Sequence, residues 1–280
     1  MRAEKMNMRH TPTVLLVIML AACSDAKPDQ AAEAQSSAQA EASGVVDAAI
    51  ANAAAAAKAV AVKDSTPLYA FDYAYPAQAA AIAPLAAWLN ADLVKQKRVL
   101  IKGAREGQAE AKDAGVEYRL YGNGTKWAVV TDLPGWLSLS AQRWEYSGGA
   151  HPNPWSESLV WDKAAGLRLN ATDLFVSPTA LSAAIRAPFC AVLDKQRAAK
   201  RGGPIDAAAD DPFVSCIDPV ESTVLLGSSD KAHFTRIGIL VDPYAAGSYS
   251  EGEYEVTLPV TPALLRAVKP KYRSAFAVGR

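Results

Sequence analysis

Residues 69–75 read YAFDYAY, and this stretch decides how the rest of the chain is interpreted. Bulky aromatic residues alternate here with small or polar residues, which is the period of a strand with one buried face. Pro76 follows directly and lacks the N–H that a strand ladder needs, so we expect the strand to end there. No aromatic residue precedes Tyr69 in the chain. We therefore place the start of the folded domain near Thr66.

Two long helices are expected after this strand. Apolar residues at spacings of three and four predict an amphipathic helix over residues 82–99, with a solvated continuation over residues 102–115. Ser177 and Pro178 are residue types typical of a helix N-cap and first turn, so a second helix should begin there. Pro188 should kink this second helix.

Strand patterns dominate the remainder. Residues 116–131 alternate on both sides of a Gly-Asn-Gly sequence at 122–124, which predicts a β-hairpin that turns at these glycines. Neighbouring strands with hairpin turns, together with separate helices, predict an α+β domain with a mostly antiparallel sheet. A short closing helix should begin at Pro262. The further strands are expected at residues 136–146, 156–161, 167–169, 224–226, 234–241 and 254–260.

Residues 1–22 have the composition of a secretory signal peptide. The first ten residues are basic, and residues 14–20 form an apolar run too short to span a bilayer as a mature helix. The run leads into Leu-Ala-Ala-Cys at residues 20–23, which resembles the lipobox of bacterial lipoproteins. We therefore expect cleavage before Cys23 and lipidation of its sulfur. Ser24 follows the cysteine, and by resemblance to the Gram-negative sorting rule it favours the periplasmic face of the outer membrane.

Residues 23–65 are rich in Ala, Gln, Glu and Ser. Such small or polar side chains bury too little area to offset the entropy of ordering, so we interpret this segment as a tether that is disordered or transiently helical. The helix propensity of alanine also allows a helical stalk. Removal of residues 1–22 leaves 26 basic against 28 acidic side chains. This near-neutral composition gives no excess positive charge for nucleic acid or anionic lipid. Membrane attachment should therefore come from the lipid on Cys23.

The remaining cysteines and histidines are few. Cys190 and Cys216 are left once Cys23 is assigned to lipidation, and in an oxidising compartment two cysteines are expected to form a disulfide. His151 and His233 survive removal of the signal, but neither lies in a metal-binding motif. We therefore expect neither a metal nor another cofactor.

Residues 144–154, WEYSGGAHPNP, bring Glu145, Ser147 and His151 close together in the sequence. A hydrolase could use His151 as a base with Ser147 or Glu145, although Ser147 does not lie in a nucleophile-elbow motif. The interpretation that we favour is a strand that ends in a tight glycine turn, with His151 fastening a loop.

A candidate binding surface lies around the same loop. Trp155 follows in a proline-containing segment and is expected to be exposed, and tryptophan is enriched at binding hot spots. Tyr244 lies in a second rigid loop, Asp-Pro-Tyr-Ala-Ala-Gly, which suits either binding or a simple connection. His151, Trp155 and Tyr244 are therefore the predicted surface residues.

Several of these motifs together resemble a known pair of domains. The C-terminal motifs resemble the domain of unknown function shared by the anti-sigma factor RsiV and related exported proteins. Residues 66–145 resemble the domain that precedes the catalytic part of the peptidoglycan deacetylase PdaC. We accordingly divide the folded part into residues 66–145 and 146–280, within one compact unit. The C-terminal motifs are YSGGAH at 146–151, ESL at 157–159, TDLF at 172–175, VDPYAAG at 241–247 and EVTLP at 255–259.

The resemblance implies recognition more than catalysis. RsiV binds lysozyme through its outer domain, and PdaC deacetylates peptidoglycan through its attached catalytic domain. Neither the zinc motif of the deacetylase nor a sigma-binding segment is recognisable in this chain. The resemblance therefore implies a non-enzymatic envelope lipoprotein that binds a lysozyme-like protein or peptidoglycan. The alternatives are a cell-wall hydrolase centred on His151 and a structural envelope protein that mediates assembly.

Overall fold

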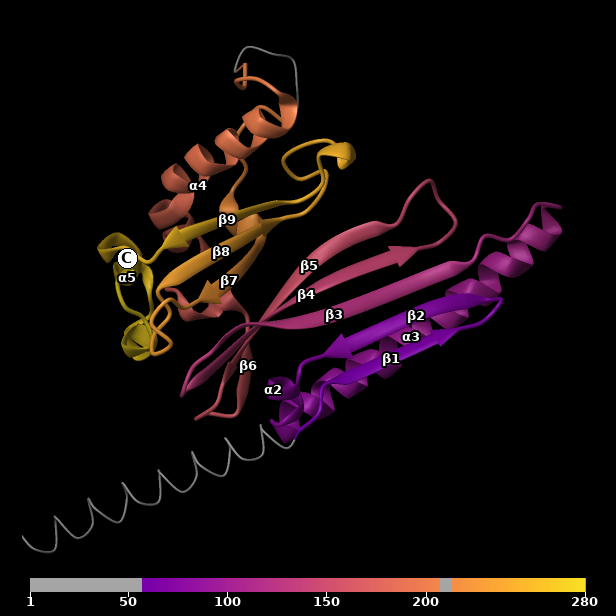
Figure 1. Ribbon diagram of the computed structural model, residues 1–280, viewed down its shortest axis with the longest axis horizontal. Coiled ribbons are helices and arrows are strands. Elements are labelled where there is room, and N and C mark those ends of the chain that lie inside the picture. Colours follow the sequence, from indigo (N-terminus) through magenta and orange to yellow (C-terminus); the bar gives the residue numbers. More distant parts are fainter. Residues whose placement is uncertain (1–56, 207–212, 280) are drawn as a thin grey trace, which may run out of the picture. The chain divides into compact units, whose positions relative to one another are not determined.

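The computed structural model describes residues 57–206 and 213–279 (Figure 1). The predicted signal peptide, Cys23 and most of the predicted tether lie outside these described residues. In the described part, strands and helices build a six-stranded sheet and a separate three-stranded antiparallel sheet, which confirms the α+β class. The predicted single sheet is thus two sheets.

The six-stranded sheet follows the order of the sequence. Its neighbours are antiparallel except for β2 and β3, which are parallel because α2 and α3 connect them as a crossover on one face. The elements are β1 (Val60–Ser65), β2 (Tyr69–Tyr75), α2 (Ala77–Ala80), α3 (Ala83–Asp113), β3 (Tyr121–Asp132), β4 (Trp136–Tyr146), β5 (Asn153–Asp162) and β6 (Leu167–Leu169).

The aromatic strand predicted at residues 69–75 is β2. Its four aromatic residues from Tyr69 to Tyr75 are all buried, because alternate side chains of a strand point to one face and α3 covers that face. Leu85 and Leu89 of α3 are fully buried in the same core. The predicted strand, its end at Pro76 and the long amphipathic helix are confirmed.

Strand β1 corrects the predicted tether boundary. Residues 60–65 were expected to be disordered, but they pair antiparallel with β2, from Val60 opposite Tyr75 to Ser65 opposite Ala70. Val60 and Val62 pack against the aromatic core, and this packing outweighs the small side chains around them. The alanine-rich composition that precedes Val60 hid this short alternation.

The predicted hairpin over residues 116–131 is wrong. Residues 116–120 form no strand, and the Gly-Asn-Gly sequence lies inside β3, where it cannot turn. The glycines are required by packing: a Cβ on Gly122 would come within 2.7 Å of the Trp144 ring, and one on Gly124 would come closer still. A strand glycine can therefore mark the close approach of a large side chain as well as a turn.

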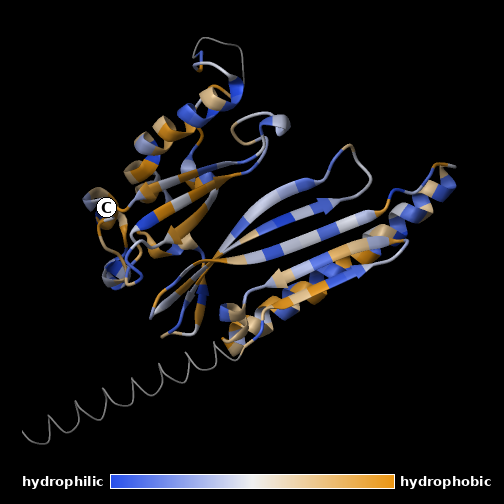
Figure 2. Ribbon diagram, in the orientation of Figure 1, coloured by the Kyte–Doolittle hydropathy of each residue, from blue (hydrophilic) through white to orange (hydrophobic). Residues whose placement is uncertain are grey.

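The C-terminal elements form the second core. Hydrophobic and hydrophilic residues alternate along α4, and its apolar side packs against the three-stranded sheet (Figure 2). Ser177 caps α4 as predicted, since its Oγ accepts a hydrogen bond from the N–H of Ala180 at 3.0 Å. Pro188 lies inside the helix. The elements are α4 (Pro178–Arg201), β7 (Thr223–Gly227), β8 (Arg236–Val241), β9 (Tyr254–Pro259) and α5 (Pro262–Ala267), with 3₁₀ turns at Ala171–Leu174, Pro219–Glu221, Tyr249–Glu251 and Pro270–Ala275.

The predicted disulfide is confirmed. Cys190 of α4 is bonded to Cys216, with 5.7 Å between their Cα atoms, and this bond ties α4 to the segment before β7. Arg197 of α4 is fully buried nearby and donates to the backbone carbonyls of Val214 and Ser215. A covalent bond and a buried guanidinium thus hold the same segment.

The two sheets are in contact. Thr223 of β7 donates a hydrogen bond to the carbonyl of Ser156 on β5 at 2.9 Å, and Val160 of β5 belongs to the core under α4. The expected division between residues 145 and 146 falls inside β4, just before its last residue, and β4 is hydrogen-bonded to β5. Both predicted parts of the chain therefore contribute strands to the six-stranded sheet.

Candidate functional site

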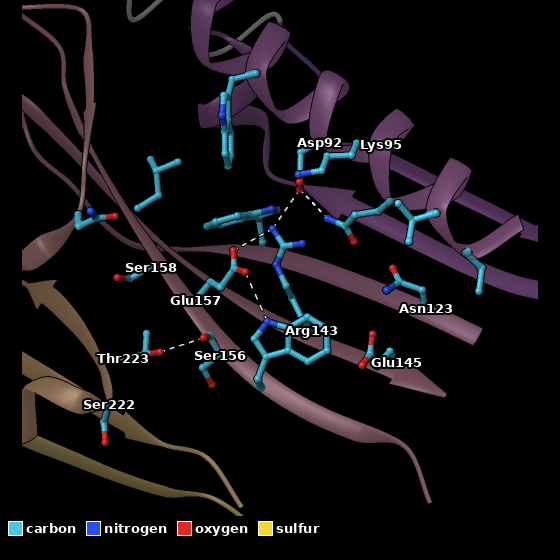
Figure 3. A pocket seen from close by; sticks show the side chains of 18 of the residues that line it. Asp92, Lys95, Asn123, Arg143, Glu145, Ser156, Glu157, Ser158, Ser222 and Thr223 are labelled. Atoms are coloured by element: carbon cyan, nitrogen blue, oxygen red, sulfur yellow. Dashed lines mark hydrogen bonds and ion pairs between the residues drawn. The ribbon is translucent and has the colours of Figure 1, made fainter. Parts of the chain in front are cut away.

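A pocket of about 790 Å³ lies where α3, the six-stranded sheet and β7 meet. Figure 3 shows polar side chains entering it from both the helix and the strands. Its wall combines aromatic rings with charged groups, a mixture typical of small-molecule sites. Its aromatic and charged lining includes Trp88, Asp92, Lys95, Trp127, Arg143, Glu145, Trp155, Glu157 and Arg168.

Arg143 stands at the centre of the pocket. It lies on the buried side of β4, and its side chain is only 7% exposed. Its Nη2 lies 3.0 Å from Oδ2 of Asp92 and 2.9 Å from Oε2 of Glu157, so one guanidinium bridges α3 and β5 (Figure 3). A buried charge of this kind is tolerated only when it is paired, and both carboxylates supply that pairing.

Asp92 is held from several directions. Its Oδ2 accepts hydrogen bonds from the hydroxyl of Tyr73 at 2.9 Å and from Nε2 of Gln96 at 2.6 Å. Burial, followed by the charge of Asp92, raises the pKa of Tyr73 well above its usual value, so Tyr73 stays a hydrogen-bond donor. Trp127 donates to the Tyr73 hydroxyl in turn, at 3.2 Å. The carboxylate is thus positioned before any ligand binds.

One polar atom of this network has no hydrogen-bond partner. Within the described residues, Nε of Arg143 is buried and has no hydrogen-bond partner. Buried polar atoms are nearly always paired, and an unpaired one costs free energy. The core thus retains an arginine with one unpaired nitrogen despite the free-energy cost, which indicates that this site has a function.

Three tryptophans line the pocket. The rings of Trp88 and Trp127 meet edge to face with their centroids 6.1 Å apart, and the guanidinium of Arg168 lies 4.7 Å from the centroid of Trp88. Trp155 is half-buried, and its Nε1 lies 3.4 Å from Oε1 of Glu157. The flat apolar rings of the tryptophans therefore lie next to charged side chains that can form hydrogen bonds.

The charges of the pocket wall are balanced. Three basic side chains and three acidic side chains line it, so no net field selects a strongly charged ligand. The arrangement suits a neutral molecule that has apolar surface for the rings and hydroxyl or amide groups for the charged side chains. The basic residues are Lys95, Arg143 and Arg168, and the acidic residues are Asp92, Glu145 and Glu157.

The predicted hydrolase residues lie at two different places. Ser147 and Glu145 line the rim of the pocket, whereas His151 does not. Among the described residues, His151 makes no hydrogen bond to Ser147 or Glu145. Its ring instead stacks on Tyr249 with centroids 3.7 Å apart, and its Nε2 lies 3.3 Å from the hydroxyl of Tyr244. These contacts fasten the β4–β5 loop to the segment between β8 and β9, as the favoured interpretation expected.

The predicted binding surface is partly assembled. His151 and Tyr244 are neighbours, and Tyr244 is 55% exposed with a positive φ of 70°. Trp155 lies within β5 and is half-buried, so its expected place in an exposed loop is wrong. It lines both the main pocket and a smaller groove of about 490 Å³ that Tyr249 also lines. Pairing with Arg143 on β4 is the reason that Trp155 belongs to the sheet.

The central residues of the pocket were missed at the sequence level. Arg143, Asp92 and Glu157 come from three separate elements and share no linear motif. One signal was available: in β4 the alternation places Arg143 on the same face as Leu139 and Ala141, and an arginine on the buried face of a strand needs partners.

Within residues 57–206 and 213–279, no cluster of three or more His, Cys, Asp or Glu side chains is placed to hold a metal ion. Nor does any helix in those ranges have the length and apolarity needed to cross a membrane.

The sequence matches the family model described as deacetylase PdaC over residues 62–154, from β1 into β5. This supports the resemblance predicted for residues 66–145. No curated protein matches the chain significantly. Similar solved structures include a DUF3298 family protein from Bacteroides fragilis, 16% identical, with a TM-score of 0.47, covering 72% of this chain and 88% of that one. Another is a DUF3298 family protein from Pseudomonas aeruginosa, also 16% identical, with a TM-score of 0.44 and coverage of 80% and 98%.

Proposed function

We propose that the chain is a non-enzymatic recognition module of the cell envelope and that its pocket binds the glycan of peptidoglycan. The observation that carries the proposal is the fixed Asp92–Arg143–Glu157 network beside Trp88 and Trp155. A sugar ring has an apolar C–H face that packs on aromatic rings and a rim of hydroxyl and amide groups that needs fixed hydrogen-bonding partners.

Two further points support this choice of ligand. The balanced charge of the pocket wall favours a neutral polymer over a strongly charged one. The family model described as deacetylase PdaC covers residues 62–154, which include Asp92 and Arg143. The resemblance to PdaC links this type of domain to proteins that act on peptidoglycan.

Attachment to the envelope is the second part of the proposal. Cys23 follows a signal-like segment, so we propose that it is lipidated and that the chain faces the periplasm from the outer membrane. Substitution of Cys23 by serine should abolish incorporation of labelled palmitate and release the protein from the membrane fraction when it is washed with high salt, which suppresses electrostatic association. Retention of both the label and the membrane association would refute this assignment.

Binding is tested by co-sedimentation of the full chain with insoluble peptidoglycan. We expect Trp155→Ala to weaken binding by about tenfold or more, since it removes an aromatic wall of the pocket. Tyr244→Ala is the matched control, because Tyr244 is an exposed aromatic residue outside the pocket. Loss of binding in Tyr244→Ala alone would move the site to the His151 surface, and no binding by the wild type would refute the glycan proposal.

The same experiment addresses the alternatives. We favour binding over hydrolysis because His151 makes no hydrogen bond to Ser147 or Glu145 among the described residues, and we expect no soluble fragments to be released from peptidoglycan. Release that depends on His151 would favour the hydrolase. Retention on immobilised lysozyme without retention on peptidoglycan would assign the module to a lysozyme-like protein instead.

A further inference from the structure

The outer face of α3 carries more basic than acidic side chains. Residues 94–105 contain five basic residues and no acidic one. Val94, Arg98, Ile101 and Arg105 follow one another at spacings of four, three and four, which places them on one stripe of the helix. The stripe and Lys102 beside it are called the basic face below.

This face is opposite the one that packs on the sheet. Leu89, Leu100 and Ala104 of α3 are buried in the aromatic core, whereas the side chain of Val94 is 60% exposed. A shallow groove of about 690 Å³ runs along the outer side of the helix. Its lining mixes apolar and basic side chains and consists of Leu93, Val94, Lys97, Arg98, Ile101, Lys102, Arg105 and Glu106.

Little of the positive charge is neutralised within the described chain. Lys97 is paired with Asp64 at 2.6 Å, and Lys102 has only a loose contact of 3.7 Å with Glu106, in which both side chains are more than half exposed. Arg98 and Arg105 make no salt bridge within residues 57–206 and 213–279. A helix face that is merely solvated usually mixes charges of both signs.

We propose that the basic face docks on the surface of an anionic lipid bilayer. Lysine and arginine side chains attract anionic headgroups, and apolar side chains between them enter the boundary between headgroups and acyl chains. Val94 is the residue that enters this boundary, whereas Ile101 is half-buried at the edge of the face and packs against the aromatic core. The neutral composition of the whole chain concealed this surface, because the compensating acidic residues lie elsewhere.

Strand β1 begins near the start of α3. Val60 pairs with Tyr75, and the hydroxyl of Tyr75 donates to the side chain of Asn90, one turn before Val94. The described chain thus begins beside the N-terminal half of α3. Lipidation of Cys23 is not required for this docking, because the attraction is a property of the basic face itself.

The test is flotation of the full chain with vesicles, in a Cys23→Ser background that excludes acylation. Vesicles of equal parts phosphatidylglycerol and phosphatidylcholine should bind the chain, with binding that weakens as salt is added. Arg98→Glu with Arg105→Glu should reduce the affinity by at least about thirtyfold. The matched control is Lys195→Glu with Arg266→Glu, which changes the net charge equally at exposed positions of α4 and α5 and should bind as the reference does.

A second variant separates a bilayer from a soluble polyanion. Val94→Thr keeps the shape of the side chain but replaces one methyl group with a hydroxyl, so vesicle binding should fall several-fold while binding to heparin stays unchanged. Equal vesicle binding by the Arg98 and Arg105 double variant and the control would overturn the proposal, and so would vesicle binding that Val94→Thr leaves unchanged. Arg98 and Arg105 lie outside the main pocket, so peptidoglycan binding by the double variant reports on the proposed function separately.

Discussion

Arg143 and Asp92 lie 51 residues apart in the chain, yet Nη2 of the arginine is 3.0 Å from Oδ2 of the carboxylate. The parallel crossover from β2 to β3 makes this contact possible, because it lays α3 across the face of the sheet onto which Arg143 projects. Glu157 closes the arrangement from β5. A helix and two strands are therefore joined through one buried guanidinium.

We predict that Arg143→Met lowers the free energy of unfolding by about 3 kcal/mol. Methionine fills much of the space, but Asp92 and Glu157 lose the charge that compensates them. We expect a loss of stability near the low end of the range for removing one partner of a buried ion pair. The reason is that the Glu157 side chain is 41% exposed, so water can reach it. Urea denaturation followed by tryptophan fluorescence measures the difference.

Lys63→Met is the control for this substitution. Lys63 lies 3.8 Å from Asp72, but its side chain is 87% exposed, so the change should cost less than about 1 kcal/mol. A similar cost for both variants would mean that the pairing of Arg143 contributes no more than an ordinary surface ion pair.

We predict that Gly124→Ala destabilises the protein by about 2 kcal/mol, since a Cβ there overlaps the ring of Trp144. The cost should shrink when the same change is made in a Trp144→Ala background, because the overlap is then absent. A double-mutant cycle of unfolding free energies measures this coupling.

Gly103→Ala provides the matched comparison. Gly103 lies inside α3 and has open space where a Cβ would be placed. Alanine there should stabilise the protein by up to about 1 kcal/mol through helix propensity. Equal destabilisation at both glycines would show that the packing of Trp144 is not the reason for glycine in β3.

Local patterns in the sequence predicted most of the elements. Alternation located β2 and β4, and Ser177 marked the start of α4, because these signals depend only on nearby residues. The glycines of β3 were misinterpreted as a turn, since the reason for them is the ring of Trp144 on the neighbouring strand. Strand β1 was missed because its partner, β2, supplies the stability that its own composition lacks.

The pocket was harder to predict for the same reason. Asp92 lies on the helix side that turns toward the sheet, but only the fold shows that Arg143 and Glu157 face it. The Glu145, Ser147 and His151 cluster drew attention because its residues are close in sequence, yet the structure places His151 against Tyr249. Closeness along the chain was a poor guide to closeness in space at this site.

We predict that removal of the disulfide lowers the free energy of unfolding by about 3 kcal/mol. Cys190 and Cys216 are separated by 26 residues, and the open chain gains entropy mainly in the unfolded state. The comparison is between wild type and a Cys190→Ala, Cys216→Ala double variant under oxidising conditions. The difference should largely vanish when both proteins are measured with a reductant, and a difference that persists would point to lost packing around the sulfur atoms.

We predict that the contribution of Glu251 to stability disappears in acid. Burial raises the pKa of Glu251, but hydrogen bonds from Tyr254 and Arg201 outweigh it and lower the pKa to about 2. Because the folded pKa lies below the unfolded one, the stabilisation is complete above the ordinary pKa of 4.5 and is lost as the pH falls toward 2. The difference in Tm between wild type and Glu251→Gln should therefore be constant near neutral pH and shrink across this window.

Tyr254→Phe tests the cause. It removes a hydroxyl that donates to Oε2 of Glu251 while leaving the Arg201 contact of 3.0 Å in place. The pKa of Glu251 should then rise, so the loss of stability should begin at a higher pH than in the wild type. An unchanged window in Tyr254→Phe would assign the low pKa to Arg201 and to the N–H of Ser248, which also donates to Glu251.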